Sequence, residues 1–392
     1  MTEGKRTNGA EIGKRFYDIF NRTDRDRPAE KWGDIQVLND LAAKGGVTHE
    51  EALLLLAMPD DIEEVLRKKE SSGKESASLQ RLLFWSDEKR KLKVLVRADD
   101  PVKAAAGMGE GAQGIGLIRG EALLRSEDRL LEVYADWLDN RNYEKRKHMR
   151  FRLVSLWTEE WTKILQAAEG KPCAVSLAWD VLGDGGPEER LELQDIQLES
   201  LFRAAARCQE EGTECRLEVL ALWPMDAADF MAVHDFIEEV AQQMMGALRY
   251  GTNLRIGALL HPDVLPSDAG DVTRLADVIV IDTECASKFH LVDERNSLGG
   301  LAGTMDMSEP LKEWCSPALL YPRLEETILK IRRVKPDIRI RAGGQIKAGD
   351  LRTVYRLGMT EVCCAPEDLA AIRLTGFRLE MIEGRHSASE EA

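Results

Sequence analysis

Several charged residues end or directly follow short apolar runs, where a parallel sheet would gather them at one edge. Arg119 ends GIGLIR, His261 follows LRIGALL, Asp282 ends DVIVID with Glu284 two residues later, and Arg341 stands within IRIRAG. Arginine holds phosphate or carboxylate oxygens through its planar fork of N–H donors. Carboxylates and imidazole are ligands for divalent metal ions and groups that move protons. The pattern therefore indicates an anion site with metal-binding or acid–base groups beside it.

The elements that must position these residues are short apolar runs, which alternate with amphipathic helical stretches from residue 91 onwards. This alternation is typical of strand–helix–strand units around a parallel sheet. The expected strands cover 92–98, 114–120, 174–180, 216–222, 254–260, 277–282, 338–343 and 360–365. Eight strands are the number that closes a (β/α)8 barrel. The sequence thus predicts an α/β fold, a TIM barrel over 91–392 with a helical N-terminal extension over 1–90, and a doubly wound sheet is the alternative.

The alternation of side chains along each strand predicts which residues reach the mouth of such a barrel. In AVSLAWD, Ser176 and Asp180 face inward and Trp179 faces the helices, while the isoleucines of IRIRAG turn Arg341 inward. Barrel sites lie at the carboxyl ends of the strands. The predicted mouth contains Arg119, Asp180, His261, Asp282, Glu284 and Arg341. The alternative is that these charges only pair with one another as a solvated rim.

The composition limits the classes of partner. The 392 residues include 54 basic and 69 acidic ones, and the net charge of −15 repels nucleic acid and anionic lipid. No apolar run reaches the roughly 18 residues of a membrane helix, and the N-terminus lacks the apolar stretch of a signal peptide. The seven cysteines are scattered without CxxC spacing, which argues against a disulfide framework or a zinc site. We expect a cytoplasmic protein with no membrane or nucleic-acid partner.

Three motifs carry a resemblance to a known family. GAQGIGLIRGEALL at 111–124 resembles the GAEGIGLxRTE motif of pyruvate, phosphate dikinases and other phosphoenolpyruvate-utilising enzymes. The preceding VRADDPVKAAAGMGEGA is similar to that family's ANADTPEDA segment, and GMTEVCCAPEDLAAIRL is similar to GLDYVSCSPxRVPIARL. Upstream, the segment 41–66 resembles the helices with ITKEEALLRI. The resemblance covers about 36–380 and implies the C-terminal barrel that binds phosphoenolpyruvate (PEP) or pyruvate.

The resemblance assigns roles to some residues and also implies partners. It makes Arg119 and Glu121 part of the substrate site, and Asp180 matches the acid of a second motif. The family's barrels commonly dimerise, so a homodimer is expected. The family's ATP-grasp and phosphohistidine domains have no counterpart in these residues, and we do not expect the chain to run the complete dikinase cycle alone.

Other positions of the family's site carry different residues here. Its second arginine falls at Ser176, its metal-binding glutamate at His261, and its proton-donating cysteine at Arg341 or Ala342. The magnesium-binding GTND motif becomes Asp282, Thr283, Glu284 and Cys285. Because these groups act as one catalytic unit, their joint replacement predicts that the dikinase reaction is lost.

The residues that stand at the mouth suggest two kinds of site, a metal site and an anion site. His261, Asp282 and Glu284 are candidate ligands for magnesium or another divalent metal, with a salt-bridged rim as the alternative. Arg341 and His261 are the candidate catalytic residues. Gly343 and Gly344 precede a predicted helix and could hold an anion through their amides, with a tight turn as the alternative.

The function hypothesis is a divergent, dikinase-like pseudoenzyme that binds a small anionic metabolite resembling PEP or pyruvate, or a partner protein. One alternative is an active metal-dependent enzyme with altered chemistry, either phosphoryl transfer or C–C or C–O chemistry on a 2-oxo acid. Another is a non-catalytic subunit whose region 1–90 docks on separate ATP-grasp or phosphohistidine chains.

Overall fold

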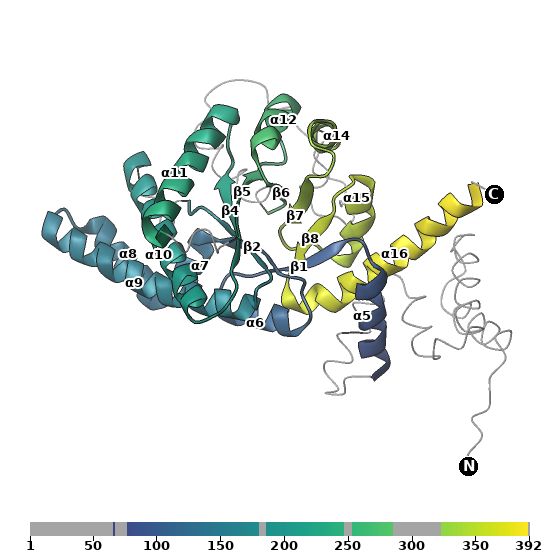
Figure 1. Ribbon diagram of the computed structural model, residues 1–392, viewed down its shortest axis with the longest axis horizontal. Helices are drawn as coiled ribbons and strands as arrows, with labels where there is room; N and C mark the ends of the chain where they lie inside the picture. The colour runs from purple at the N-terminus through teal and green to yellow at the C-terminus, as the bar shows by residue number, and fades with distance from the viewer. Residues whose placement is uncertain (1–65, 67–76, 180–185, 247–252, 285–322, 391–392) are drawn as a thin grey trace, which may run out of the picture. The chain divides into compact units, whose positions relative to one another are not determined.

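The computed structural model describes residue 66 and residues 77–179, 186–246, 253–284 and 323–390 (Figure 1). The chain divides into two compact units, Met1–Lys91 with Ala370–Ala392, and Leu92–Leu369. We expected a boundary near residue 90, and the second unit begins close to it, whereas the C-terminal helix groups with the N-terminal unit. The segment 41–66 lies outside the described residues except for its last residue.

The second unit is a closed barrel of parallel strands, which confirms the predicted fold class. Each strand pairs with its neighbours in the chain, and β1 pairs with β8 to close the ring (Figure 1). The strands are β1 Lys93–Arg97, β2 Ile115–Arg119, β3 Pro172–Ser176, β4 Arg216–Leu222, β5 Asn253–Leu260, β6 Val278–Asp282, β7 Arg339–Gly343 and β8 Glu361–Cys364. All eight overlap the runs expected from the sequence.

Helices cover the outside of the barrel between consecutive strands (Figure 1). They are α6 Pro101–Gly109, α7 Gly120–Ser126, α8 Asp128–Asp139, α9 Tyr143–Ala168, α10 Pro187–Glu210, α11 Ala227–Met245, α12 Pro266–Leu275, α14 Leu324–Val334 and α15 Leu351–Arg356. Side-chain caps define several starts, since Asp100 accepts from the amide of Lys103 at α6 and Asp226 accepts from that of Asp229 at α11. None of the described helices is long and apolar enough to cross a membrane.

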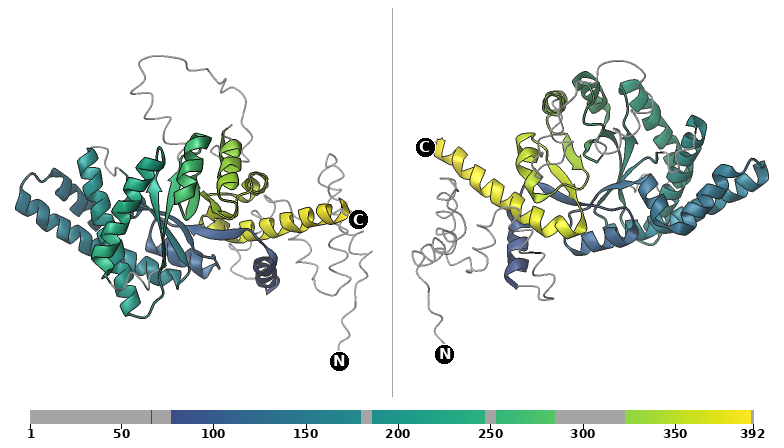
Figure 2. Two further views of the ribbon diagram at one scale, coloured as in Figure 1. Left: turned by 45° about the horizontal axis from the view of Figure 1, so that its top comes forward. Right: turned by 180° about the vertical axis from the view of Figure 1, so that it is seen from behind.

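The helices α8 and α9 lie side by side, as their labels in Figure 1 and the same colours in Figure 2 show. Trp157 and Trp161 of α9 are buried, and their rings stack with centroids 6.2 Å apart, as packing on one helix face predicts.

The basic run over 141–152 is partly neutralised, because Arg146 donates a hydrogen bond to Glu192 at 2.7 Å.

The first unit contains two described helices, α5 Ala77–Lys89 and α16 Leu369–Glu390. Ser86 Oγ donates to the carbonyl of Arg373 at 2.8 Å, and the guanidinium of Arg373 pairs with Asp87. The amide of Lys91 donates to Glu380 at 2.7 Å. Polar contacts therefore bind the N-terminal helix to the C-terminal one.

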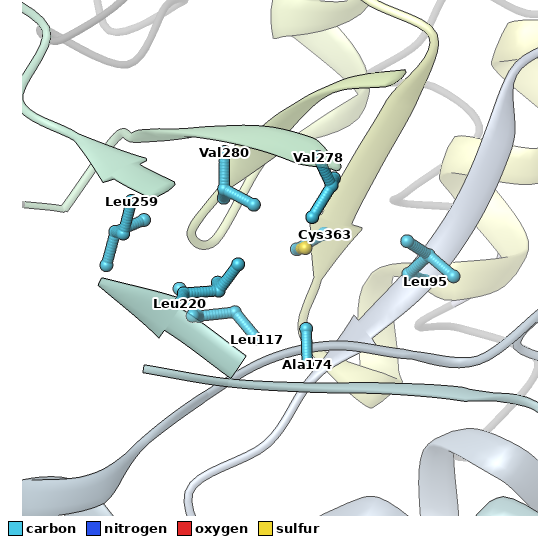
Figure 3. Packing of buried hydrophobic residues seen from close by; sticks show 8 residues of the cluster. All are labelled: Leu95, Leu117, Ala174, Leu220, Leu259, Val278, Val280 and Cys363. Atoms are coloured by element: carbon cyan, nitrogen blue, oxygen red, sulfur yellow. The ribbon is translucent and has the colours of Figure 1, made fainter. Parts of the chain in front are cut away.

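Inward-facing side chains fill the barrel in levels, because every second residue of a strand points to the axis. The middle level is apolar and packs side chains from most of the strands against one another (Figure 3). Its members are Leu95, Leu117, Ala174, Leu220, Leu259, Val280 and Cys363, and Val278, the preceding inward residue of β6, belongs to the same apolar cluster. Two residues further along β1, β2 and β6, the inward positions become charged and form the mouth.

The level at the amino ends of the strands is an ionic cluster, which is unusual for an interior that branched apolar side chains normally dominate. Arg341 donates to Glu361 at 2.6 and 2.9 Å, to Glu218 at 2.8 Å, and to the carbonyl of Gly116 at 2.8 Å. Arg339 donates to Glu218 at 2.6 Å. We call Arg339, Arg341, Glu218 and Glu361 the basal cluster.

Candidate functional site

Two arginines from neighbouring strands meet on one carboxylate at the mouth. Arg97 ends β1, and its Nε and Nη2 donate to the two oxygens of Glu284 at 3.1 Å each. Arg119 ends β2, and its Nε donates to Glu284 Oε2 at 3.2 Å. Both arginines are only 6% exposed, so the pair lies below the surface of the mouth. Three N–H groups of the two arginines thus converge on the carboxylate of Glu284, in the arrangement that suits a planar anion.

The second carboxylate of the mouth, Asp282, is fully buried at the end of β6. Its Oδ1 accepts from Arg119 at 2.5 Å and from the amide of Glu284 at 3.0 Å. Its Oδ2 accepts from the indole nitrogen of Trp223 at 3.0 Å. Asp282 therefore fixes Arg119 on one side and Trp223 on the other.

The arginines keep their charge although they are nearly buried. Burial lowers the pKa of Arg119, but Asp282, Glu121 and Glu284 outweigh it and hold that pKa above its usual value. Burial likewise opposes the charge of Arg97, and Glu284 with Asp99 again raises the pKa. Two permanent cations consequently face the axis, each compensated by carboxylates of the chain itself.

A buried hydroxyl lies next to the arginines. Ser176 ends β3, is fully buried, and is the register partner of Arg119 on β2. Its Oγ has no hydrogen-bond partner among the described residues. An unsatisfied buried hydroxyl costs about 1–3 kcal/mol, so a polar ligand that reached it would be favoured.

The backbone beyond Ser176 is held by one glutamine of α10. Gln197 accepts from the amide of Ala178 at 2.7 Å and donates to the carbonyl of Ser176 at 2.9 Å. Gly120 leaves the space for this amide, since a Cβ there would lie 2.4 Å from Gln197 Nε2. Two hydrogen bonds of Gln197 therefore hold the exit of β3, where Ser176 pairs with Arg119 of β2.

An aromatic sector occupies the ends of β3, β4 and β5. The ring centroid of Trp223 lies 5.7 Å from that of Trp179 and 6.2 Å from that of His261. Trp223 has a φ of 47°, in the left-handed region, which costs a non-glycine residue roughly 1–3 kcal/mol. Trp179 is 36% exposed, and the guanidinium of Arg190 covers its ring at 3.7 Å. We call Trp179, Trp223 and His261 the aromatic sector.

His261 is half-buried, and its Nδ1 accepts from the amide of Asp263 at 3.2 Å. Burial lowers the pKa of His261, although Asp282 and Asp263 oppose that shift. The imidazole is therefore neutral near pH 7.

The metal ion that the resemblance implies does not fit the described residues. The oxygens of Asp282 and Glu284 accept from N–H donors, including two guanidinium groups whose charge repels a cation. The described part of the chain contains no group of three or more His, Cys, Asp or Glu residues that could hold a metal ion. His261 adds a nitrogen, which Mg²⁺ disfavours relative to oxygen.

The structure brings together most of the expected mouth. Arg119, Asp282, Glu284 and His261 lie there, and Glu121 approaches Arg119 at 3.8 Å. Asp180 and Cys285 lie outside the described residues.

Arg341 differs from the expectation. It points inward as the strand pattern predicts, but its hydrogen bonds place it in the basal cluster and not at the mouth. Gly343 and Gly344 have a packing role, since a Cβ at Gly344 would lie 2.1 Å from Thr283 Oγ1. The segments that follow are a 3-10 turn and the six-residue α15, too short for a strong helix dipole.

Two residues of the site were missed from the sequence. Arg97 could have been found, because it stands two places after the inward Leu95 in LKVLVRA. Trp223 carried no such signal, because its position depends on the left-handed turn after β4. The expectation that Trp179 faces the helices fails because β3 ends at Ser176, before that residue.

The fold is an eight-stranded (β/α)8 barrel with two arginines at its mouth, and the comparisons with known proteins show its family. Residues 73–377 match the family described as PEP-utilising enzyme, PEP-binding domain, and the chain belongs to this family. It is 31% identical over 355 residues to the chloroplastic pyruvate, phosphate dikinase 1 of Oryza sativa subsp. japonica, covering 78% of this chain and 37% of that protein. With pyruvate, phosphate dikinase of Clostridium symbiosum it is 31% identical over 354 residues, covering 76% and 40%.

The matched region thus spans about 40% of the length of these relatives. Among solved structures, tryptophan synthase from Pyrococcus furiosus matches with 12% identity and a TM-score of 0.34, over 76% of this chain and 99% of that one.

Proposed function

We propose that this chain binds a small organic anion of the pyruvate type between Arg97 and Arg119, without phosphoryl transfer between PEP and pyruvate. The observation that carries the proposal is the pair of nearly buried guanidinium groups on one carboxylate. In this view Glu284 occupies the place of the ligand's carboxylate. The orphan hydroxyl of Ser176 beside Arg119 supplies a further donor for the ligand's second oxygen.

Glu284 is the carboxylate that a ligand would displace. Each of the two carboxylates accepts from three N–H donors, but the side chain of Glu284 is 23% exposed, whereas that of Asp282 is 0% exposed. Moving Glu284 into water therefore costs less than moving Asp282. The exchange replaces one carboxylate by another and leaves the charge of both arginines compensated.

The replaced residues argue against the dikinase reaction. The oxygens of Asp282 and Glu284, the candidate metal ligands at the mouth, accept from N–H donors instead. The described cysteines are all buried, and Cys363 belongs to the apolar level below the mouth, where burial raises its pKa to about 12. A thiol in that position is poorly placed to protonate a ligand at the mouth.

Isothermal titration of the purified full chain tests the proposal with pyruvate, PEP, oxalate and phosphate. Pyruvate and oxalate should bind, and Arg97→Gln should weaken both by at least roughly tenfold, since hydrogen bonds to charged groups contribute about 1.5–3 kcal/mol. Arg352→Gln, at an exposed arginine of α15, is the matched control and should leave binding unchanged.

Glu284→Ala is a second test of the proposal, which does not depend on whether Arg97→Gln folds. Removal of the internal carboxylate should tighten pyruvate binding, because the site no longer has to release Glu284 first. The proposal is wrong if none of the four anions binds, or if Arg97→Gln is folded and binds them as the unmodified chain does.

A further inference from the structure

We infer that the mouth prefers an anion that carries a planar aromatic ring, an aromatic 2-oxo acid, with the ring against Trp179 and Trp223. This inference rests on the proposed anion site and adds the class of ligand. It comes from the division of the mouth into two parts. Guanidinium and carboxylate groups converge from β1, β2 and β6, while the aromatic sector occupies the ends of β3, β4 and β5.

The two parts lie within reach of one small molecule. Arg119 and Trp223 contact opposite oxygens of the same carboxylate, Asp282, at 2.5 and 3.0 Å. The guanidinium and the indole nitrogen are thus separated by little more than one carboxylate group. A three-carbon acid bound to the arginines would leave Trp179 and Trp223 unused, whereas a ring on its third carbon would extend toward them.

The aromatic sector has the features of a binding surface and is not simply part of the core. Trp179 is 36% exposed, although a Trp gains more than most residues from burial. Trp223 keeps an indole at a left-handed backbone position that glycine would occupy without strain, and such strain concentrates at ligand sites. The hydrogen bond to Asp282 fixes the plane of that indole.

The charge of Arg190 disfavours a cationic ring in the aromatic sector. Arg190 already covers one ring face of Trp179 at 3.7 Å, so a cationic ligand group would meet a like charge there. A phenyl ring has no such penalty, and it can stack or meet the tryptophans edge-on. The ligand therefore combines a carboxylate for the arginines with a ring that carries no positive charge.

Isothermal titration of the full chain with three 2-oxo acids tests the inference: pyruvate, 4-methyl-2-oxopentanoate and phenylpyruvate. They share the group that the arginines would hold and differ in having no side group, a branched aliphatic one, or a planar ring. Phenylpyruvate should bind at least roughly tenfold more tightly than pyruvate, and more tightly than the aliphatic acid. Trp179→Ala should remove this advantage and leave the affinity for pyruvate unchanged.

Phe151→Ala, at an aromatic residue of α9 that is 65% exposed, is the matched control and should retain the preference. Equal binding of pyruvate and phenylpyruvate would overturn the inference and leave the anion site standing. A preference for phenylpyruvate that survives in Trp179→Ala would also overturn it. Failure of all three acids to bind would overturn the inference and the proposed function together.

Discussion

Arg341→Met should strongly destabilise the barrel and leave ligand binding intact. The Arg341 side chain is 1% exposed, and those of Glu218 and Glu361 are 3% and 2% exposed. In the variant, the remaining partners of these two buried carboxylates are Arg339, which contacts both, and Lys93, whose Nζ lies 3.8 Å from Glu361. Loss of one partner from a buried ion pair costs about 3–5 kcal/mol, because the other charge stays buried without compensation.

The assay is urea unfolding of the full chain at pH 7 and at pH 4.5, with Arg352→Met as the exposed control. Burial raises the pKa of Glu218, but Arg341 and Arg339 outweigh it and lower that pKa below 4.5 in the folded protein. The carboxylate of the unmodified chain therefore contributes stability above pH 4.5, and that contribution is lost as the pH falls through the folded pKa. In the variant this carboxylate can take up a proton, so the difference between the two proteins should shrink at the lower pH.

The triple variant Glu218→Leu, Arg341→Met and Glu361→Leu separates the cost of unpaired charge from the cost of lost packing. It should recover much of the stability, since apolar replacement of a whole buried cluster is often neutral or favourable. A loss below about 1 kcal/mol for Arg341→Met at pH 7 would refute the reasoning, because that is the magnitude of an exposed pair. A folded Arg341→Met chain that no longer bound pyruvate would refute the placement of Arg341 outside the ligand site.

Three further predictions concern the mouth. Glu284→Ala should tighten pyruvate binding roughly tenfold in isothermal titration, about 1.4 kcal/mol for a displaced internal carboxylate. The affinity for pyruvate should be the same with magnesium and with a chelator, because the oxygens of Asp282 and Glu284 accept from N–H donors, and a clear dependence on the metal would contradict this expectation. Because burial lowers the pKa of His261 below 6.5, the folded protein should lose stability as the pH falls through 6.5, and His261→Gln should reduce that slope in thermal unfolding.

The sequence is sufficient to predict the strands of the barrel, and strand alternation brings Arg119, Asp282 and His261 to the mouth. It does not predict which charges pair, since pairing depends on the register between strands that are far apart in the chain. Arg341 illustrates the difference: alternation gives the direction of a side chain, whereas its level along the axis depends on the neighbouring β8 and on β4 across the barrel. The aromatic sector depends on the backbone conformation of Trp223, which no local pattern of apolar residues indicates.

The basal cluster also has a consequence for how the barrel folds. Its members come from both halves of the ring, Glu218 from β4 and Arg341 and Glu361 from the neighbouring strands β7 and β8, and Arg341 also contacts the carbonyl of Gly116 on β2. A half-barrel of β1 to β4 would bury Glu218 without an arginine partner. A half-barrel of β5 to β8 would contain Arg339 and Arg341 with only one carboxylate, Glu361. A partly closed barrel therefore contains unpaired buried charges, and all of them are paired only when the eight strands have closed. The basal cluster thus makes closure of the barrel cooperative.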